Sequence, residues 1–172
     1  MAWHFLLRAA LFAALLGGSY ASHAASKTAT LGVQATLLPA CTAGSSVSGT
    51  ISFGTLNFGT YLTLDSAVSM VGQAGSGALR VNCLNNTPYR VLISAGGSGS
   101  VANRRMTGPG AKTLGYNLYT DATFTTVWND SAGVSRTGNG QDQWLPVYGR
   151  VPAQAVPLAG VYTDTLTVTI SW

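Results

Sequence analysis

The sequence predicts an all-β protein, an antiparallel sandwich of about seven short strands. Its composition is poor in helix-forming residues: the 172 residues include no glutamate, only 8% are charged, and 21 are glycine. Hydrophobic residues still make up 47% of the chain, which argues against a disordered protein. Residues 28–37 and 161–172 alternate between apolar and polar side chains, the period of a strand with one buried face.

The first 24 residues have the organisation of an export signal. A basic residue, Arg8, precedes the apolar run 9–16, and Ser22-His23-Ala24 fits a small-x-small cleavage pattern. We therefore expect residues 1–24 to be a signal peptide that is cut after Ala24. Removing Arg8 lowers the formal net charge from +4 to +3.

The next segment, residues 25–38, is the clearest strand candidate. Its alternation ends at Pro39, just before Cys41. No other strand comes before it in the expected mature chain, so pairing within the molecule and pairing with another molecule both remain open. The face that would be buried comprises Ala29, Leu31, Val33, Ala35 and Leu37.

The two cysteines, Cys41 and Cys83, predict one structural disulfide, because an even number of cysteines usually pairs in an oxidising compartment. A catalytic thiol would need a neighbouring base, and both histidines, His4 and His23, lie in the expected signal peptide. The loss of the histidines also argues against the common zinc and haem sites. We expect no metal, no cofactor and no enzymatic activity.

Further strands are expected in the body of the chain. Alternation and β-branched or aromatic residues favour strands within 47–53, 58–61, 78–84, 88–95, 114–119, 125–128 and 143–151. Pro146 interrupts the last of these ranges, which suggests an edge strand or a bulge. The final strand, 161–172, places threonines on one face and an apolar row on the other, namely Tyr162, Leu166, Val168, Ile170 and Trp172.

Two polar features have plain structural explanations. The glycine-rich stretches 72–77 and 96–99 lack the lysine and the strand–loop–helix context of a phosphate loop, so we expect turns or mobile loops. The doublet Arg104-Arg105 is expected to lie in a solvated loop. The other basic residues are scattered along the sequence, which argues against nucleic acid as a partner.

Asp164 is the carboxylate that interrupts the apolar row of the final strand. A buried unpaired charge is costly, so we expect either a position near the end of the strand or an arginine partner such as Arg90 or Arg150. A lone carboxylate makes a poor hydrolase site. The remaining aspartates lie in polar stretches and are expected to be solvated; they are Asp65, Asp121, Asp130 and Asp142.

Several short motifs occur in an order typical of one family. From the N-terminus they are Leu38-Pro39-Ala40-Cys41, Leu79-Arg80-Val81-Asn82-Cys83, Arg105-Met106, Leu114-Gly115-Tyr116-Asn117-Leu118-Tyr119, Tyr148-Gly149-Arg150-Val151-Pro152-Ala153-Gln154 and Gly160-x-Tyr162-x-Asp164-x-Leu166-x-Val168. With these motifs the mature chain resembles the spore coat protein U domain family, which includes subunits of archaic (Csu-type) chaperone–usher pili. It departs from the family pattern at Asn129, where glycine is expected, and at the final aromatic, Trp172.

The resemblance implies an incomplete immunoglobulin-like sandwich over residues 39–172, with residues 25–38 as an N-terminal donor strand. In this family a periplasmic chaperone lends the missing strand during transit. The donor strand of a neighbouring subunit then replaces it at the outer-membrane usher, and the subunit reaches the cell surface. By parity, we expect the acceptor groove to be lined by Val91, Ile93, Leu166, Val168 and Ile170.

The residue pattern supports such an exchange energetically. Burying Leu31, Val33 and Leu37 would contribute about 2 kcal/mol each. Ladder hydrogen bonds would add ~0.5–1.5 kcal/mol each, and the total is enough for long-lived strand addition. Since a head-to-tail interface of this kind does not close, it would yield a fibre.

The expected function is therefore a structural subunit of a surface fibre that serves adhesion or biofilm formation. Two alternatives stay open. An adhesin module that recognises sugars or abiotic surfaces would normally carry a second domain, for which this chain has no room. A small outer-membrane β-barrel would also end in an aromatic strand, but the expected disulfide, the proline-broken strands and the lack of clear aromatic girdles count against it.

Overall fold

The computed structural model describes residues 27–36, 40–47 and 50–172. The expected signal peptide, and Leu37 of the expected donor strand, lie outside the described residues. The chain divides into two units, Met1–Thr36 and Leu37–Trp172. In the first unit, residues 27–36 are exposed and form no strand.

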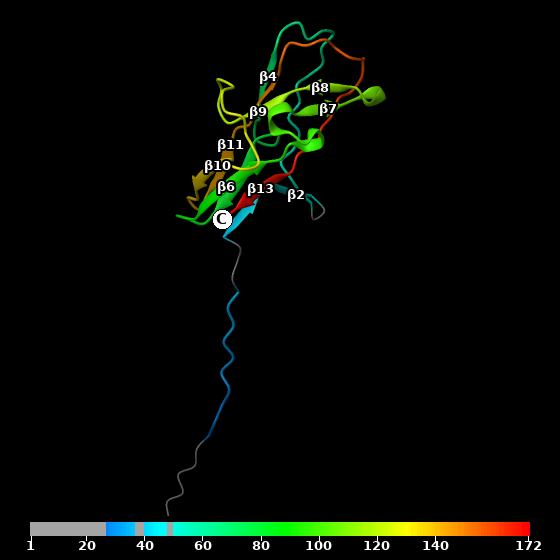
Figure 1. The fold of residues 1–172 in the computed structure, drawn as a ribbon. Coiled ribbons are helices and arrows are strands. Elements are labelled where there is room, and N and C mark those ends of the chain that lie inside the picture. Colours follow the sequence, from blue (N-terminus) through cyan, green and yellow to red (C-terminus); the bar gives the residue numbers. More distant parts are fainter. Residues whose placement is uncertain (1–26, 37–39, 48–49) are drawn as a thin grey trace, which may run out of the picture. The chain divides into compact units, whose positions relative to one another are not determined.

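The second unit is built almost entirely of short strands (Figure 1). They are β1 (Cys41–Ala43), β2 (Ser45–Val47), β3 (Thr50–Ser52), β4 (Val68–Val71), β5 (Leu79–Cys83), β6 (Pro88–Ile93), β7 (Arg105–Thr107), β8 (Thr113–Gly115), β9 (Asn117–Tyr119), β10 (Val134–Thr137), β11 (Asp142–Leu145), β12 (Tyr148–Val151) and β13 (Val168–Ser171). Three 3₁₀ turns interrupt them: η1 (Gly96–Ser98), η2 (Val101–Asn103) and η3 (Pro109–Ala111). Over the described ranges we find no helix that is long and apolar enough to span a membrane.

All of the strand pairs are antiparallel. Three sheets have three strands each, in the orders β1–β5–β11, β10–β6–β13 and β4–β12–β9, and the hairpins β2–β3 and β7–β8 complete the unit. In Figure 1, β4, β7 and β8 lie towards one end of this unit, and β6, β10 and β13 towards the other.

One hydrophobic core joins the three larger sheets. Val81 of β5 and Val91 of β6 are fully buried, and Leu118 of β9 and Val151 of β12 belong to the same cluster. Trp128, which lies outside any strand, is 1% exposed, and its indole N–H donates to the Val91 carbonyl at 3.0 Å. Side chains from separate sheets thus meet in one interior, as in a sandwich, and the predicted all-β sandwich is confirmed.

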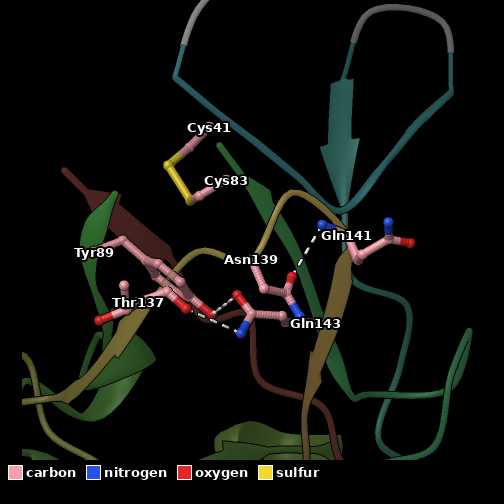
Figure 2. The surroundings of a disulfide bond; sticks show 7 residues. All are labelled: Cys41, Cys83, Tyr89, Thr137, Asn139, Gln141 and Gln143. Atoms are coloured by element: carbon pink, nitrogen blue, oxygen red, sulfur yellow. Dashed lines mark hydrogen bonds between the residues drawn. A yellow bond between two sulfur atoms is a disulfide. The ribbon is translucent and has the colours of Figure 1, made fainter. Parts of the chain in front are cut away.

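The disulfide between Cys41 and Cys83 is also confirmed, with an S–S distance of 2.07 Å. It links directly opposed residues of β1 and β5, and both cysteines are buried. Figure 2 shows it near a polar bridge between sheets, in which the Tyr89 hydroxyl donates to Gln143 Oε1 at 3.0 Å. The Gln143 amide in turn donates to the Thr137 carbonyl at 3.1 Å.

The strand predictions succeeded best for the two central strands. In β5 and β6 alternate residues are buried, and both strands lie within their predicted ranges. The range 47–53 falls in the β2–β3 hairpin, whereas residues 58–61 form no strand. Residues 125–128 also form no strand and make only a single bridge, between Val127 and Tyr119. The strands β1, β4, β7 and β10 were not predicted.

Pro146 marks a change of sheet rather than a bulge within one strand. Before it, β11 pairs with β5; after it, β12 pairs with β4 and β9. Proline has no amide to donate, so the ladder must stop there, and the chain uses this break to cross to another sheet. The final strand is likewise shorter than predicted, because only Val168–Ser171 lies in a ladder.

Candidate functional site: the open edge of the last strand

The strand β13 lies at the edge of its sheet, next to β6. Val168 is opposite Ile93, and Ile170 is opposite Val91, so the structure brings together four of the five residues predicted for the acceptor groove. Val91 and Ile93 are buried in the core, at 0% and 2% exposure. The reachable part of the predicted groove therefore belongs to the last strand and not to β6.

The ladder between β6 and β13 shows which backbone groups face outward. The Ser94 amide donates to the Thr167 carbonyl at 2.9 Å. In an antiparallel ladder the direction of the backbone groups alternates, so Val168 and Ile170 direct their amides and carbonyls away from β6. Within the described part of the chain no strand pairs with β13 on that side. Two amides and two carbonyls therefore form an open edge.

The side chains of the last segment separate into two faces, as predicted. Leu166, Val168 and Ile170 are partly buried and pack against the core. Thr167 and Thr169 on the other face are exposed. An unpaired edge with an apolar face only partly covered is a surface that can accept a further strand.

Asp164 fixes the start of this segment, but its partner is not an arginine. Its carboxylate accepts hydrogen bonds from the Tyr116 hydroxyl at 2.8 Å, from the Gly97 amide at 3.0 Å and from the Thr165 amide at 2.9 Å. Gly96 has a φ of +64°, and a Cβ there would lie 2.3 Å from the carboxylate. The expectation of an Arg90 or Arg150 partner is wrong, because a phenol and a glycine-rich turn occupy that place.

The Tyr116 hydroxyl is a persistent donor to Asp164. Burial raises the pKa of Tyr116 far above its ordinary value, and the hydrogen bond to Asp164 raises this pKa further. The phenol therefore stays protonated, and we call this Tyr116–Asp164 contact the latch. It holds the last segment in place before the segment reaches β13.

Arg104 is fully buried, so the prediction of a solvated Arg104-Arg105 loop is wrong for its first residue. Its guanidinium donates to the carbonyls of Ser94, Ile93 and Trp128 at 2.9, 2.9 and 2.7 Å, and to Asn117 Oδ1 at 2.8 Å. Burial lowers the pKa of Arg104. The arginine holds the end of β6, the partner of β13. Arg105 is exposed as predicted, but it lies in β7 and not in a loop.

Two of the aspartates predicted to be solvated have specific partners. Asp142 forms an ion pair with Arg80, with 2.7 Å between Oδ2 and Nε, and this hydrogen bond holds the pKa of Asp142 below its ordinary value. The Asp121 carboxylate accepts hydrogen bonds from the backbone amides of Thr123, Thr125 and Thr126, and it thereby organises the loop after β9.

The expected donor residues lie on the exposed N-terminal segment. Ala29, Leu31, Val33 and Ala35 are all exposed, with Leu31 at 87% and Val33 at 86%. Large aliphatic side chains of this kind are normally buried. Their exposure along one alternating face marks the segment as a second candidate partner-binding element.

Comparisons with known proteins cover most of the chain. The model of the Spore Coat Protein U domain family matches residues 27–169. Protein U of Myxococcus xanthus is 35% identical over an alignment of 163 residues, and the match covers 88% of this chain and 88% of Protein U. A chain from the crystal structure of the CsuC–CsuE chaperone–tip adhesion subunit pre-assembly complex, from the archaic chaperone–usher Csu pili of Acinetobacter baumannii, is 22% identical with a TM-score of 0.49.

That similarity covers 80% of this chain and 40% of the solved chain, so this protein spans less than half the length of the Acinetobacter chain. The family model extends from the exposed segment through the body into β13, and the match to Protein U covers 88% of this chain. On these two matches the chain belongs to the Spore Coat Protein U domain family.

Proposed function

We propose that this protein is a non-enzymatic structural subunit of a surface fibre, assembled by donor-strand exchange and serving adhesion or biofilm formation. The open edge of β13 is the observation that carries the proposal, because it presents unpaired backbone groups beside partly covered apolar side chains. Such an edge in water invites a further strand. The exposed N-terminal segment of a second copy has the alternation that such a strand needs.

The proposed interface uses both the backbone and the side chains. The outward amides and carbonyls of Val168 and Ile170 would pair with the donor backbone. The donor face comprising Ala29, Leu31, Val33, Ala35 and Leu37 would cover the apolar side of the last segment. Each large aliphatic side chain buried adds about 2 kcal/mol, so the donor would exchange slowly once seated.

Each subunit then gives one strand and accepts another, which produces a head-to-tail chain without closure. Family membership supports an assembly route in which a periplasmic chaperone protects the open edge and an outer-membrane usher directs the exchange. On this proposal the protein is exported, passes through the periplasm and ends at the cell surface. Copies of the same chain or related subunits are the neighbours in the fibre.

The direct test removes the donor and supplies it again. The mature chain without residues 25–38 should form no fibres, and a synthetic peptide of residues 27–38 should bind to it and raise its thermal stability. A control peptide with Leu31 and Val33 changed to serine keeps the length and charge but removes most of the apolar face, and should bind far more weakly. Fibres from the truncated chain, or equal binding of both peptides, would contradict the proposal.

A further inference from the structure

A polar groove lies on the part of the body formed by β7, β8, β9 and β12. It consists of two adjoining hollows, of which the larger has a volume of about 850 Å³. Asn103, Arg105 and Thr113 line both hollows. A groove of this size is within the usual range for ligand sites of ~300–1,000 Å³, and strand exchange does not use it.

The groove carries two exposed arginines, and the carboxylate nearest to it, Asp164, is held by the Tyr116 hydroxyl and the Gly97 amide. Arg105 and Arg150 line it and are exposed, and no carboxylate lines either hollow. In residues 40–47 and 50–172 the structure has one ion pair, Arg80 with Asp142, so neither of the exposed groove arginines, Arg105 and Arg150, has a carboxylate partner. Both guanidinium groups are free to bind an anion.

One wall of the groove is held in a fixed arrangement. The Arg150 guanidinium lies 5.2 Å from the centre of the Phe124 ring, a cation–π contact. Phe124 meets Tyr119 edge to face at 5.5 Å. The Gln154 side-chain amide donates to the Gly115 carbonyl at 2.8 Å, and its side-chain oxygen accepts from the Gly115 amide at 3.0 Å, so two lining residues of the larger hollow are held together. Such preorganisation lowers the entropic cost of binding.

We propose that this groove binds acidic oligosaccharides, with sugar carboxylates held by Arg105 and Arg150. The planar guanidinium is suited to two parallel hydrogen bonds to a carboxylate. Thr113, Ser100 and Asn103 supply neutral donors and acceptors of the kind that sugar hydroxyls need. The Tyr119 ring adds an amphipathic surface against which a sugar can pack.

The groove would stay accessible in a fibre. Thr163 exchanges two backbone hydrogen bonds with Thr107 of β7, at 2.8 and 3.0 Å, and Thr167 bonds Ser94. Both threonines have the same parity, so β7 and β6 lie on the same side of the last segment. The proposed donor strand adds on the opposite side. If the subunits form a fibre, each would present one groove, and weak single sites would act together on a polysaccharide.

The test measures binding of tetragalacturonate, a uronic acid oligomer, to the full mature chain by titration calorimetry, with neutral maltotetraose as the reference sugar. Tetragalacturonate should bind and maltotetraose should not. Arg105→Gln and Arg150→Gln should each weaken binding by at least about tenfold, the loss expected for one charged hydrogen bond. Arg90→Gln removes the same charge from an exposed arginine that lines neither hollow, and should leave binding unchanged.

Three outcomes would overturn the inference: no binding of tetragalacturonate, equal weakening by Arg90→Gln, or tighter binding of an oligothymidylate of equal charge. The second would show unspecific charge attraction and the third a nucleic-acid surface. Fibre formation by the Arg105→Gln and Arg150→Gln variants is scored separately by electron microscopy. A failure of sugar binding with normal fibres would leave the proposed function intact.

Discussion

The N-terminal segment and the last segment carry the same alternating pattern but have opposite structural outcomes. In residues 27–36, the apolar side chains are exposed and no ladder forms. In the last segment, Leu166, Val168 and Ile170 pack against the core, and β13 pairs with β6. The difference cannot come from the pattern, since both segments have period two.

The contrast shows that an alternating pattern defines which face of a strand would be buried. The pattern does not define the neighbouring strand with which that strand pairs. The last segment has a partner in its own chain, and it also has the latch between Tyr116 and Asp164. Its other edge nevertheless stays open. On the proposed function, the exposed N-terminal segment of one molecule and the open edge of β13 in another molecule complement each other.

The largest effect is expected from placing charges on the apolar face of the N-terminal segment, so that it no longer has the alternating pattern of the last segment. Leu31→Asp together with Val33→Asp should abolish fibre formation, because each carboxylate would be buried without a partner at a cost of several kcal/mol. Both residues lie outside the unit Leu37–Trp172, so the substitutions remove no contact within the body. Electron microscopy and detergent-resistant ladders on gels measure the fibres.

The matched control places the same charges on the other face. Thr30→Asp with Gln34→Asp adds two carboxylates at the same spacing, on the face that should remain in solvent, so fibres should still form. Equal loss of fibres from both double variants would show that charge alone, and not the buried face, controls assembly.

The second prediction concerns the disulfide that fixes β1, the first strand after the N-terminal segment. Replacing both Cys41 and Cys83 by serine should lower the free energy of unfolding by about 4 kcal/mol, from the entropy of the open loop in the unfolded chain. Denaturant unfolding of the peptide-complemented body measures the change. A loss below about 1 kcal/mol would mean that β1 is held mainly by its ladder to β5.

Local periodicity was sufficient to predict part of the fold. β5 was predictable because Leu79, Val81 and Cys83 alternate with polar residues, and β6 because its range is rich in valine, leucine and isoleucine. The disulfide was predictable because the chain has only two cysteines. These features depend on neighbours in sequence or on simple counting.

The remaining features depend on contacts between distant segments. Arg104 is buried because carbonyls from β6 and from Trp128 converge on it, and no local pattern distinguishes it from the exposed Arg105. The change of sheet at Pro146 depends on where β4 and β9 lie. For the candidate site, parity predicted the apolar face of β13, but which of its edges is open follows only from the ladder to β6.

The smallest effect is expected from weakening the latch, the Tyr116–Asp164 contact that holds the last segment. Tyr116→Phe removes one hydrogen bond to a charged group and should cost about 2 kcal/mol, because Asp164 keeps the amides of Gly97 and Thr165. Amide hydrogen exchange should speed up at Thr163 and Thr167, whose amides bond Thr107 and Ser94, and stay unchanged in β5. Tyr61→Phe, which removes the same atom from an exposed ring, should change neither quantity. If Thr163 and Thr167 kept their protection from hydrogen exchange in Tyr116→Phe, pairing with β6 alone would hold the last segment in place. The last segment would then differ from the N-terminal segment only in having a ladder partner.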